Sequence, residues 1–208
     1  GRLRGGEPPE GGQDLAGADA FVAGDMGPTG QILAPLGRLT AAEAADGYAE
    51  QAAALAEGGV DFLLVETLSD LAEARAAVEG ARRVTDLPIV VTFSFDSHGR
   101  TMMGVRPAQA AKEMAPLVEG LGANCGRHPD EYPAILQAMA AEAPDSILWA
   151  KPNAGLPHLD GDEVVYDASP EVMAEVALRL RQAGAQIIGG CCGTTPEHIA
   201  AMSRTLAR

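Results

Sequence analysis

The hydrophobic residues of this chain gather in short apolar runs that alternate with longer amphipathic segments rich in alanine. Runs of four to eight apolar residues are typical of strands that are buried on both faces of a parallel sheet. The predicted strands lie at residues 20–24, 61–66, 88–95, 121–124, 146–151 and 185–188.

The segments between these runs have the periodicity of helices with one buried face. The first has a capping box, in which Thr40 and Glu43 satisfy each other's backbone N–H groups, and it ends at Gly58 and Gly59. The last has Thr195 as its N-cap and Pro196 at its first position. The predicted helices cover residues 40–57, 69–83, 107–119, 129–143, 170–183 and 196–202.

Six strand–helix units of this kind predict an α/β fold, with helices covering a parallel sheet. The periodicity fits a doubly wound open sheet as well as most of an eightfold barrel. Two stretches lie outside the pattern. Residues 1–19 are rich in glycine, proline and charge, which predicts a flexible lead-in before a domain at 20–208, and residues 152–169 are predicted to form a long loop.

Composition narrows the class of protein. The 208 residues suffice for one domain, and with 47% hydrophobic but only 4% aromatic residues its core is built from aliphatic side chains. A net charge of −14 argues against nucleic acid and anionic membranes as partners. No apolar run approaches a membrane span of about 20 residues, and no secretory signal is evident. Three cysteines do not suggest a disulfide framework, so the sequence predicts a cytoplasmic protein.

The three cysteines stand where predicted strands end. Cys191 and Cys192 lie in a glycine-rich turn between the last strand and the last helix, and Cys125 directly follows the fourth strand. In a βα-barrel such turns form the catalytic rim. The cysteines therefore predict a three-thiolate zinc site with its fourth position open, which favours binding a substrate thiol as thiolate.

Other interpretations of the cysteines stay open. They are also consistent with small buried hydrophobic side chains, or with a vicinal disulfide between Cys191 and Cys192. His128 follows Cys125 at the spacing of a zinc ligand pair, and it could close the site into a structural centre.

Further polar residues stand at or just past strand ends. Glu66 could hold a substrate ammonium group, although a charge facing a helix explains it as well. The backbone amides of residues 193–195 begin a helix and would favour an anion. Three side chains could orient polar groups of a substrate: Ser94, Asn124 and Asn153.

The stretch 189–199, GGCCGTTPEHI, resembles the signature of the homocysteine S-methyltransferase domain. That domain occurs in cobalamin-dependent methionine synthase and in betaine–homocysteine methyltransferase. Supporting matches follow in the family's order at 22–30 (VAGDMGPTG), 65–67 (VET), 124–125 (NC) and 152–157 (PNAGLP).

The resemblance implies a TIM (β/α)8 barrel that holds Zn²⁺ through Cys125, Cys191 and Cys192, with the homocysteine sulfur as fourth ligand. It also implies that Glu66 helps to hold the substrate amino group. The methyl donor stays open between betaine, S-methylmethionine and methylcobalamin on a corrinoid-binding protein, which methyltetrahydrofolate would supply.

The matched part resembles units three to eight of that barrel, so the first two βα units are expected to be lacking. A homodimer or another partner is then expected at the unpaired sheet edges. Two alternatives to the methyltransferase stay open: a non-catalytic zinc-binding remnant or assembly subunit, and a zinc-free barrel enzyme that binds a phosphorylated substrate at the helix start after Gly193.

Overall fold

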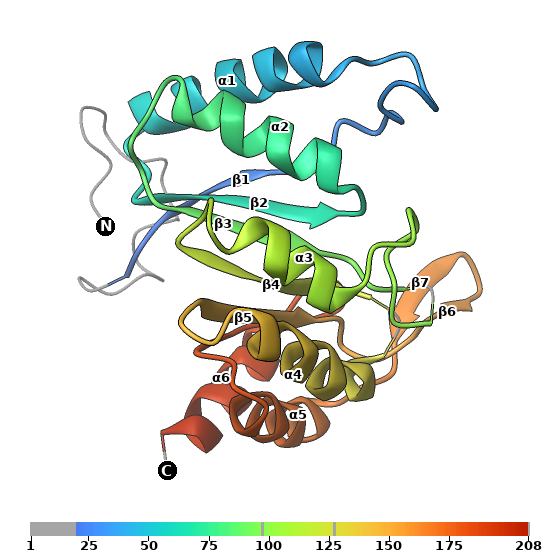
Figure 1. The fold of residues 1–208 in the computed structure, drawn as a ribbon. Coiled ribbons are helices and arrows are strands. Elements are labelled where there is room, and N and C mark those ends of the chain that lie inside the picture. The colour runs from blue at the N-terminus through green and yellow to red at the C-terminus, as the bar shows by residue number, and fades with distance from the viewer. Residues whose placement is uncertain (1–19, 97, 127, 208) are drawn as a thin grey trace.

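The computed structural model describes residues 20–96, 98–126 and 128–207, so the predicted lead-in 1–19 lies outside the described residues. The six apolar runs form one parallel sheet in the order β1-β2-β3-β4-β5-β8 (Figure 1). The strands are β1 (Ala23–Met26), β2 (Phe62–Leu68), β3 (Ile89–Phe93), β4 (Gly120–Cys125), β5 (Ile147–Pro152) and β8 (Ile187–Ile188).

The strands follow one another across the sheet in chain order, as in a barrel, whereas a doubly wound sheet reverses direction partway. The α/β barrel-type prediction is therefore confirmed. Within the described residues the sheet does not close, because β1 and β8 each pair with a single neighbour.

Two aromatic rings show how strongly the sheet curves. Phe62 lies on β2 and Trp149 on β5, and these strands are three positions apart in the sheet. In a flat sheet the distance between two such strands would be about 14 Å. Their ring centroids are nevertheless 5.6 Å apart. The face that carries these rings is therefore concave, and its carboxyl end is where the substrate of a barrel enzyme binds.

Helices cover the convex face (Figure 1). Successive strand residues alternate between the two faces, and the convex set, for example Leu63, Val91 and Leu121, is fully buried against the helices. No described helix combines the length and hydrophobicity that crossing a membrane requires. The helices are α1 (Ala41–Glu57), α2 (Leu71–Arg82), α3 (Pro107–Met114), the 3-10 helix η1 (Pro129–Glu131), α4 (Tyr132–Glu142), α5 (Pro170–Gln182) and α6 (Pro196–Leu206).

Helix boundaries agree with the sequence where a cap fixes them. The capping box of α1 is formed, since Thr40 Oγ1 accepts the Glu43 N–H (3.2 Å) and Glu43 Oε2 accepts the Thr40 N–H (2.9 Å). Helix α3 ends at Met114, earlier than predicted. Pro116 explains this end, because proline has no N–H and disfavours helical backbone at the residue before it.

The predicted loop 152–169 contains a β-hairpin instead. Strands β6 (Pro157–Asp160) and β7 (Glu163–Tyr166) pair antiparallel in a sheet of their own. The hairpin projects beside the carboxyl ends of the main strands (Figure 1). Most of its side chains are exposed, so it lacks the buried alternation that identifies strands in a sequence.

Candidate functional site

Three thiols meet at the carboxyl edge of the sheet. Cys125 is the last residue of β4, and Cys191 and Cys192 lie in the turn between β8 and α6. The Sγ–Sγ distances are 3.0 Å for Cys125–Cys191, 3.8 Å for Cys125–Cys192 and 4.0 Å for Cys191–Cys192. Within the described part of the chain, this is the only cluster of three or more His, Cys, Asp or Glu side chains that could hold a metal ion.

The sulfur positions fit a zinc ion. Tetrahedral Zn–S bonds of about 2.3 Å place two sulfurs about 3.8 Å apart, which is close to two of the three separations. A disulfide would need an S–S bond of about 2.0 Å, and all three cysteines are free. The vicinal disulfide is therefore not formed, and Cys192 is exposed, unlike a buried hydrophobic side chain.

Hydrogen bonds from β5 and α4 fix the thiol turns. Cys125 has a left-handed backbone (φ +55°), and its carbonyl accepts the Tyr132 hydroxyl at 2.9 Å. The Cys191 N–H donates to the Pro152 carbonyl at 2.9 Å. The Cys192 N–H donates to Asn153 Oδ1 at 3.1 Å. The two turns are thus bound to the strand that lies between them.

Asn124 lies buried beneath the sulfurs and connects them to β2 and β3. Its Oδ1 accepts the Thr67 N–H (2.8 Å) and the Thr92 hydroxyl (2.7 Å). Its Nδ2 donates to Thr67 Oγ1 (2.7 Å) and lies 3.6 Å from Cys125 Sγ and 3.9 Å from Cys191 Sγ. One N–H of this amide is used by Thr67, so the other points toward the two sulfurs, which favours the thiolate form.

A hydrogen bond joins the thiols of Cys125 and Cys191. The pKa of Cys191 is lowered to about 5, mainly because the Cys125 thiol donates a hydrogen bond to it, and the Asn124 amide adds to this effect. The pKa of Cys125 is raised, first by that same hydrogen bond and then by burial. A thiolate is the form that binds metal, and the cluster supplies one near neutral pH.

Of the other predicted site residues, Ser94 and Asn153 serve the protein's own turns. Ser94 Oγ accepts the Gly126 N–H (3.3 Å), and Asn153 Nδ2 donates to the Gly126 carbonyl (3.1 Å). Together with Asn124 they surround the turn after Cys125. In this structure their polar groups thus orient the cysteines.

Glu66 forms an ion pair with Lys151, a partner that the sequence pattern does not predict. Both side chains are largely buried, with 16% of Glu66 and 20% of Lys151 exposed. The interpretation of Glu66 as a charge facing a helix is wrong, because Lys151 belongs to strand β5 and the pair lies across the concave face. The sequence feature that could have identified Lys151 as a site residue is its position at the end of a strand, on the same face as Trp149.

His128 lies outside the thiol cluster. Its Nδ1 accepts the Asp130 N–H at 3.2 Å, so it caps η1 instead of closing a metal site. The helix start after Gly193 also offers few free amides. The Thr194 N–H donates to the Cys191 carbonyl (3.2 Å), and the Thr195 N–H donates to the buried His198 Nδ1 (3.1 Å). These contacts count against a phosphate site there.

The β6–β7 hairpin brings Tyr166 to the cysteines. The pKa of Tyr166 is raised by burial first and then by the nearby Cys192 side chain. The Tyr166 ring packs on Gly193, where a Cβ would lie 2.3 Å from Tyr166 Cγ. Gly193 also has φ +78°, so both backbone conformation and space require glycine.

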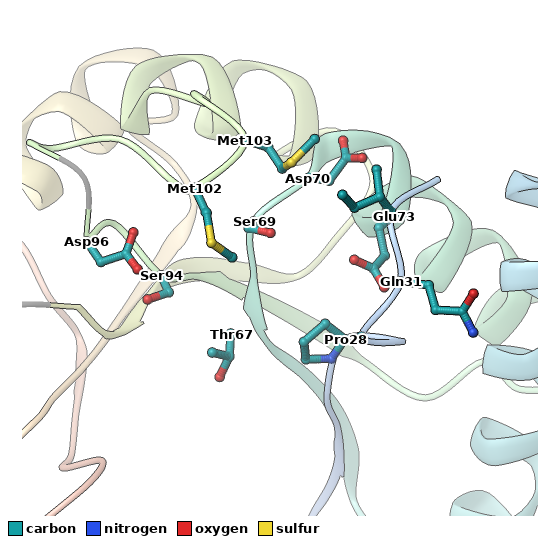
Figure 2. A pocket seen from close by; sticks show the side chains of 12 residues that line it. Pro28, Gln31, Thr67, Ser69, Asp70, Glu73, Ser94, Asp96, Met102 and Met103 are labelled. Atoms are coloured by element: carbon teal, nitrogen blue, oxygen red, sulfur yellow. The ribbon is translucent and has the colours of Figure 1, made fainter. Parts of the chain in front are cut away.

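A pocket of about 400 Å³ opens beside this site, between the loops that follow β1, β2 and β3 (Figure 2). One wall is the loop 28–32, which buried Glu73 holds, since its Oε1 accepts the Thr29 N–H (2.7 Å) and hydroxyl (2.6 Å). The lining residues are Pro28, Gly30, Gln31, Ile32, Thr67, Ser69, Asp70, Glu73, Ser94, Asp96, Met102 and Met103. Thr67 and Ser94 belong to both the pocket and the surroundings of the thiols.

Comparisons with known proteins show which family the chain resembles. The family model described as homocysteine S-methyltransferase matches residues 10–206. A methionine synthase of Mycobacterium leprae is 36% identical over 197 residues, which are 90% of this chain and 16% of that protein.

Two structures of the homocysteine methyltransferase MmuM from Escherichia coli are also similar. The apo form has a TM-score of 0.71 at 26% identity, covering 89% of this chain and 63% of that one. The metallated form has a TM-score of 0.62 at 25% identity, covering 77% and 51%. The chain thus spans about a sixth of the mycobacterial relative and less than two thirds of the E. coli enzyme.

Proposed function

The chain belongs to the homocysteine S-methyltransferase family, and we propose that it uses a zinc ion on Cys125, Cys191 and Cys192 to transfer a methyl group to homocysteine, giving methionine. The observation that carries this proposal is the meeting of three free thiols at the carboxyl edge of the sheet. A zinc ion there supplies Lewis acidity that keeps the substrate sulfur as a nucleophilic thiolate near neutral pH.

The chain's own residues prepare the site for the metal. The lowered pKa of Cys191 favours its thiolate, and zinc binding on all three sulfurs would release the remaining thiol protons, including those of Cys125 and Cys192. Asn124 and Tyr132 hold the cysteines in position, and their neutral hydrogen bonds need no rearrangement. Three protein ligands leave a fourth position for the substrate thiol.

Glu66 is proposed to receive the substrate ammonium group. Its carboxylate faces the concave side below the thiols and is largely shielded from water, which strengthens a charged hydrogen bond. The charge of Glu66 also acts on Cys191, which supports assigning the two groups to one site. Homocysteine carries its amino group and its thiol on one short chain, so it could bind Glu66 with the first and the cysteine site with the second.

The methyl donor is proposed to come from a corrinoid-binding protein or domain that carries methylcobalamin. Support comes from the mycobacterial relative named methionine synthase, of which this chain matches 16%. A homodimer stays a prediction for the sheet edges at β1 and β8. The free thiols suit the reducing cytoplasm proposed for the protein.

The test measures zinc per chain, followed by methionine formation from homocysteine with methylcobalamin, betaine or S-methylmethionine. We expect one zinc per chain and turnover with one donor. A Cys191→Ala variant is the control that should lose both. Zinc binding without turnover with any donor would favour the non-catalytic zinc-binding alternative, and a protein that takes up no zinc would refute the proposal.

A further inference from the structure

Three charged side chains share the concave face just below the thiols. Gly24 on β1 faces helix α1, because a Cβ there would lie 3.1 Å from Leu55 Cβ. Side chains alternate along a strand, so its neighbour Asp25 faces the concave side. Glu66 on β2 and Lys151 on β5 meet across that side as an ion pair.

Lys151 is held from several directions. Its ammonium pairs with Glu66, its carbonyl accepts the Tyr132 hydroxyl at 3.3 Å, and its Cγ lies 3.4 Å from the position of a Cβ on Gly189. A largely buried lysine without an anionic partner is strongly destabilising. If a substrate ammonium takes over Glu66, Lys151 needs a second carboxylate nearby.

Asp25 is that carboxylate. In the described part of the chain it forms no salt bridge within 4.0 Å, whereas Glu66 and Lys151 both act on it electrostatically. Burial and the negative charge of Glu66 raise the pKa of Asp25, and Lys151 lowers it. The charge of Cys191 raises it as well. Asp25 is in register with Leu64 on the neighbouring strand, two residues before Glu66, so the two carboxylates lie on one face beside a single lysine. One negative charge is therefore left for a further cation.

We propose that Asp25 and Glu66 form one amino-group site that holds two ammonium groups, those of Lys151 and of the substrate. Lys151 shifts its contact toward Asp25 as the substrate ammonium reaches Glu66. The same negative charges disfavour a carboxylate at this point, so the site selects thiols that carry an amine. This inference rests on the proposed function, because it assumes a thiol bound at the cysteines.

The experiment compares two thiols on the zinc-loaded chain by calorimetry. Homocysteine has the amino group, and mercaptobutyrate has the same thiol and carboxylate without it. Asp25→Asn should weaken homocysteine binding about tenfold, which is the typical effect of one charge-assisted contact. Mercaptobutyrate binding should stay unchanged. Asp46→Asn, an acid on α1 that pairs with Arg83, is the matched control and should change neither affinity.

Repeating the measurement in a Lys151→Met variant tests whether Asp25 acts by taking over Lys151 from Glu66. In Lys151→Met, Glu66 has lost its ion pair within the protein, so the substrate ammonium can bind Glu66 without displacing a lysine. Asp25 then has no lysine to receive. Adding Asp25→Asn to Lys151→Met should then change homocysteine affinity less than twofold. Equal tenfold losses in both backgrounds would show that Asp25 acts only as a distant charge, and would overturn the proposal.

The remaining outcomes separate this inference from the proposed function. If the wild-type protein binds both thiols equally, or if Asp25→Asn changes nothing, the amino-group site is wrong while the thiol site stands. If zinc is bound but neither thiol binds, the proposed function is refuted and the inference with it. Zinc content and thermal unfolding of each variant verify that it is folded.

Discussion

The two sides of the carboxyl edge are built in different ways. On the side of β4, β5 and β8, the cysteines are fixed by neutral contacts, namely backbone hydrogen bonds and the amides of Asn124 and Asn153. On the side of β1 and β2, charged groups face the concave side near the carboxyl edge: Asp25, Glu66 and the Lys151 that pairs with Glu66 from β5.

This difference matches two physical requirements. Metal ligands must keep their geometry, and neutral hydrogen bonds do so without responding to salt or to an arriving charge. A site that exchanges one cation for another is better built from ion pairs. The free-energy cost of removing water from two buried charges nearly cancels their Coulomb attraction, so one cation can replace another at little net cost. The thiol side is thus preorganised, and the acidic side is exchangeable.

The largest expected effect is on the thiol side. Cys191→Ala removes one of three metal ligands, and we expect the variant to lose stoichiometric zinc, as measured by metal analysis of purified protein. His128→Ala is the matched control and should keep one zinc per chain, because His128 lies outside the cluster. Full zinc content in Cys191→Ala would contradict the site.

The next effect tests the packing between the hairpin and the thiol turn. Gly193→Ala adds a Cβ that would lie 2.3 Å from the Tyr166 ring, at φ +78°. Overpacking and left-handed backbone together should lower the free energy of unfolding by about 2–4 kcal/mol, as measured by denaturant unfolding.

Gly161→Ala is the matched control for that variant. Gly161 has φ +64° in the hairpin turn, but nothing lies within 4 Å of its Cβ position. It should cost only about 1 kcal/mol, the backbone part. Tyr166→Ala should relieve part of the loss in Gly193→Ala, and equal losses at the two glycines would show that the Tyr166 contact is unimportant.

How far the sequence predicts this molecule depends on burial. The six strands and six helices were predictable because each buries an apolar face with a regular period. Caps such as Thr40 and Thr195 placed helix starts to within a residue or two. The β6–β7 hairpin was not predictable in this way, because it packs little of its surface and pairs mainly with itself.

The same contrast holds for the site. The cysteines could be predicted to meet, because the carboxyl ends of parallel strands share one edge. The ion pair of Lys151 with Glu66 could not, because it depends on the curvature of the sheet, which local sequence does not encode. Tyr166 and Glu73 were missed for the same reason, since each acts on a loop distant in sequence.

A smaller effect is expected on the acidic side. Glu66→Gln should weaken homocysteine binding by about 1–3 kcal/mol, because a charged hydrogen bond to the substrate ammonium becomes a neutral one. Zinc content should not change, because Glu66 is not a metal ligand. Calorimetry on zinc-loaded protein measures both the affinity and the number of sites, and unaltered affinity would limit Glu66 to holding Lys151.

The smallest effect concerns the pocket loop, farther from the sulfurs. Glu73 is buried, and its Oε1 accepts hydrogen bonds from Thr29 and, at 3.2 Å, from the Tyr48 hydroxyl. Glu73→Gln keeps the shape but makes these bonds neutral, which should lower the free energy of unfolding by about 1 kcal/mol. Glu79→Gln, which removes an exposed ion pair with Arg83, should cost at most about 0.5 kcal/mol. Zinc content should stay at one per chain in both variants if the thiol side is independent of the pocket loop. Loss of zinc in Glu73→Gln would instead show that the pocket loop is mechanically coupled to the thiol side through Thr67.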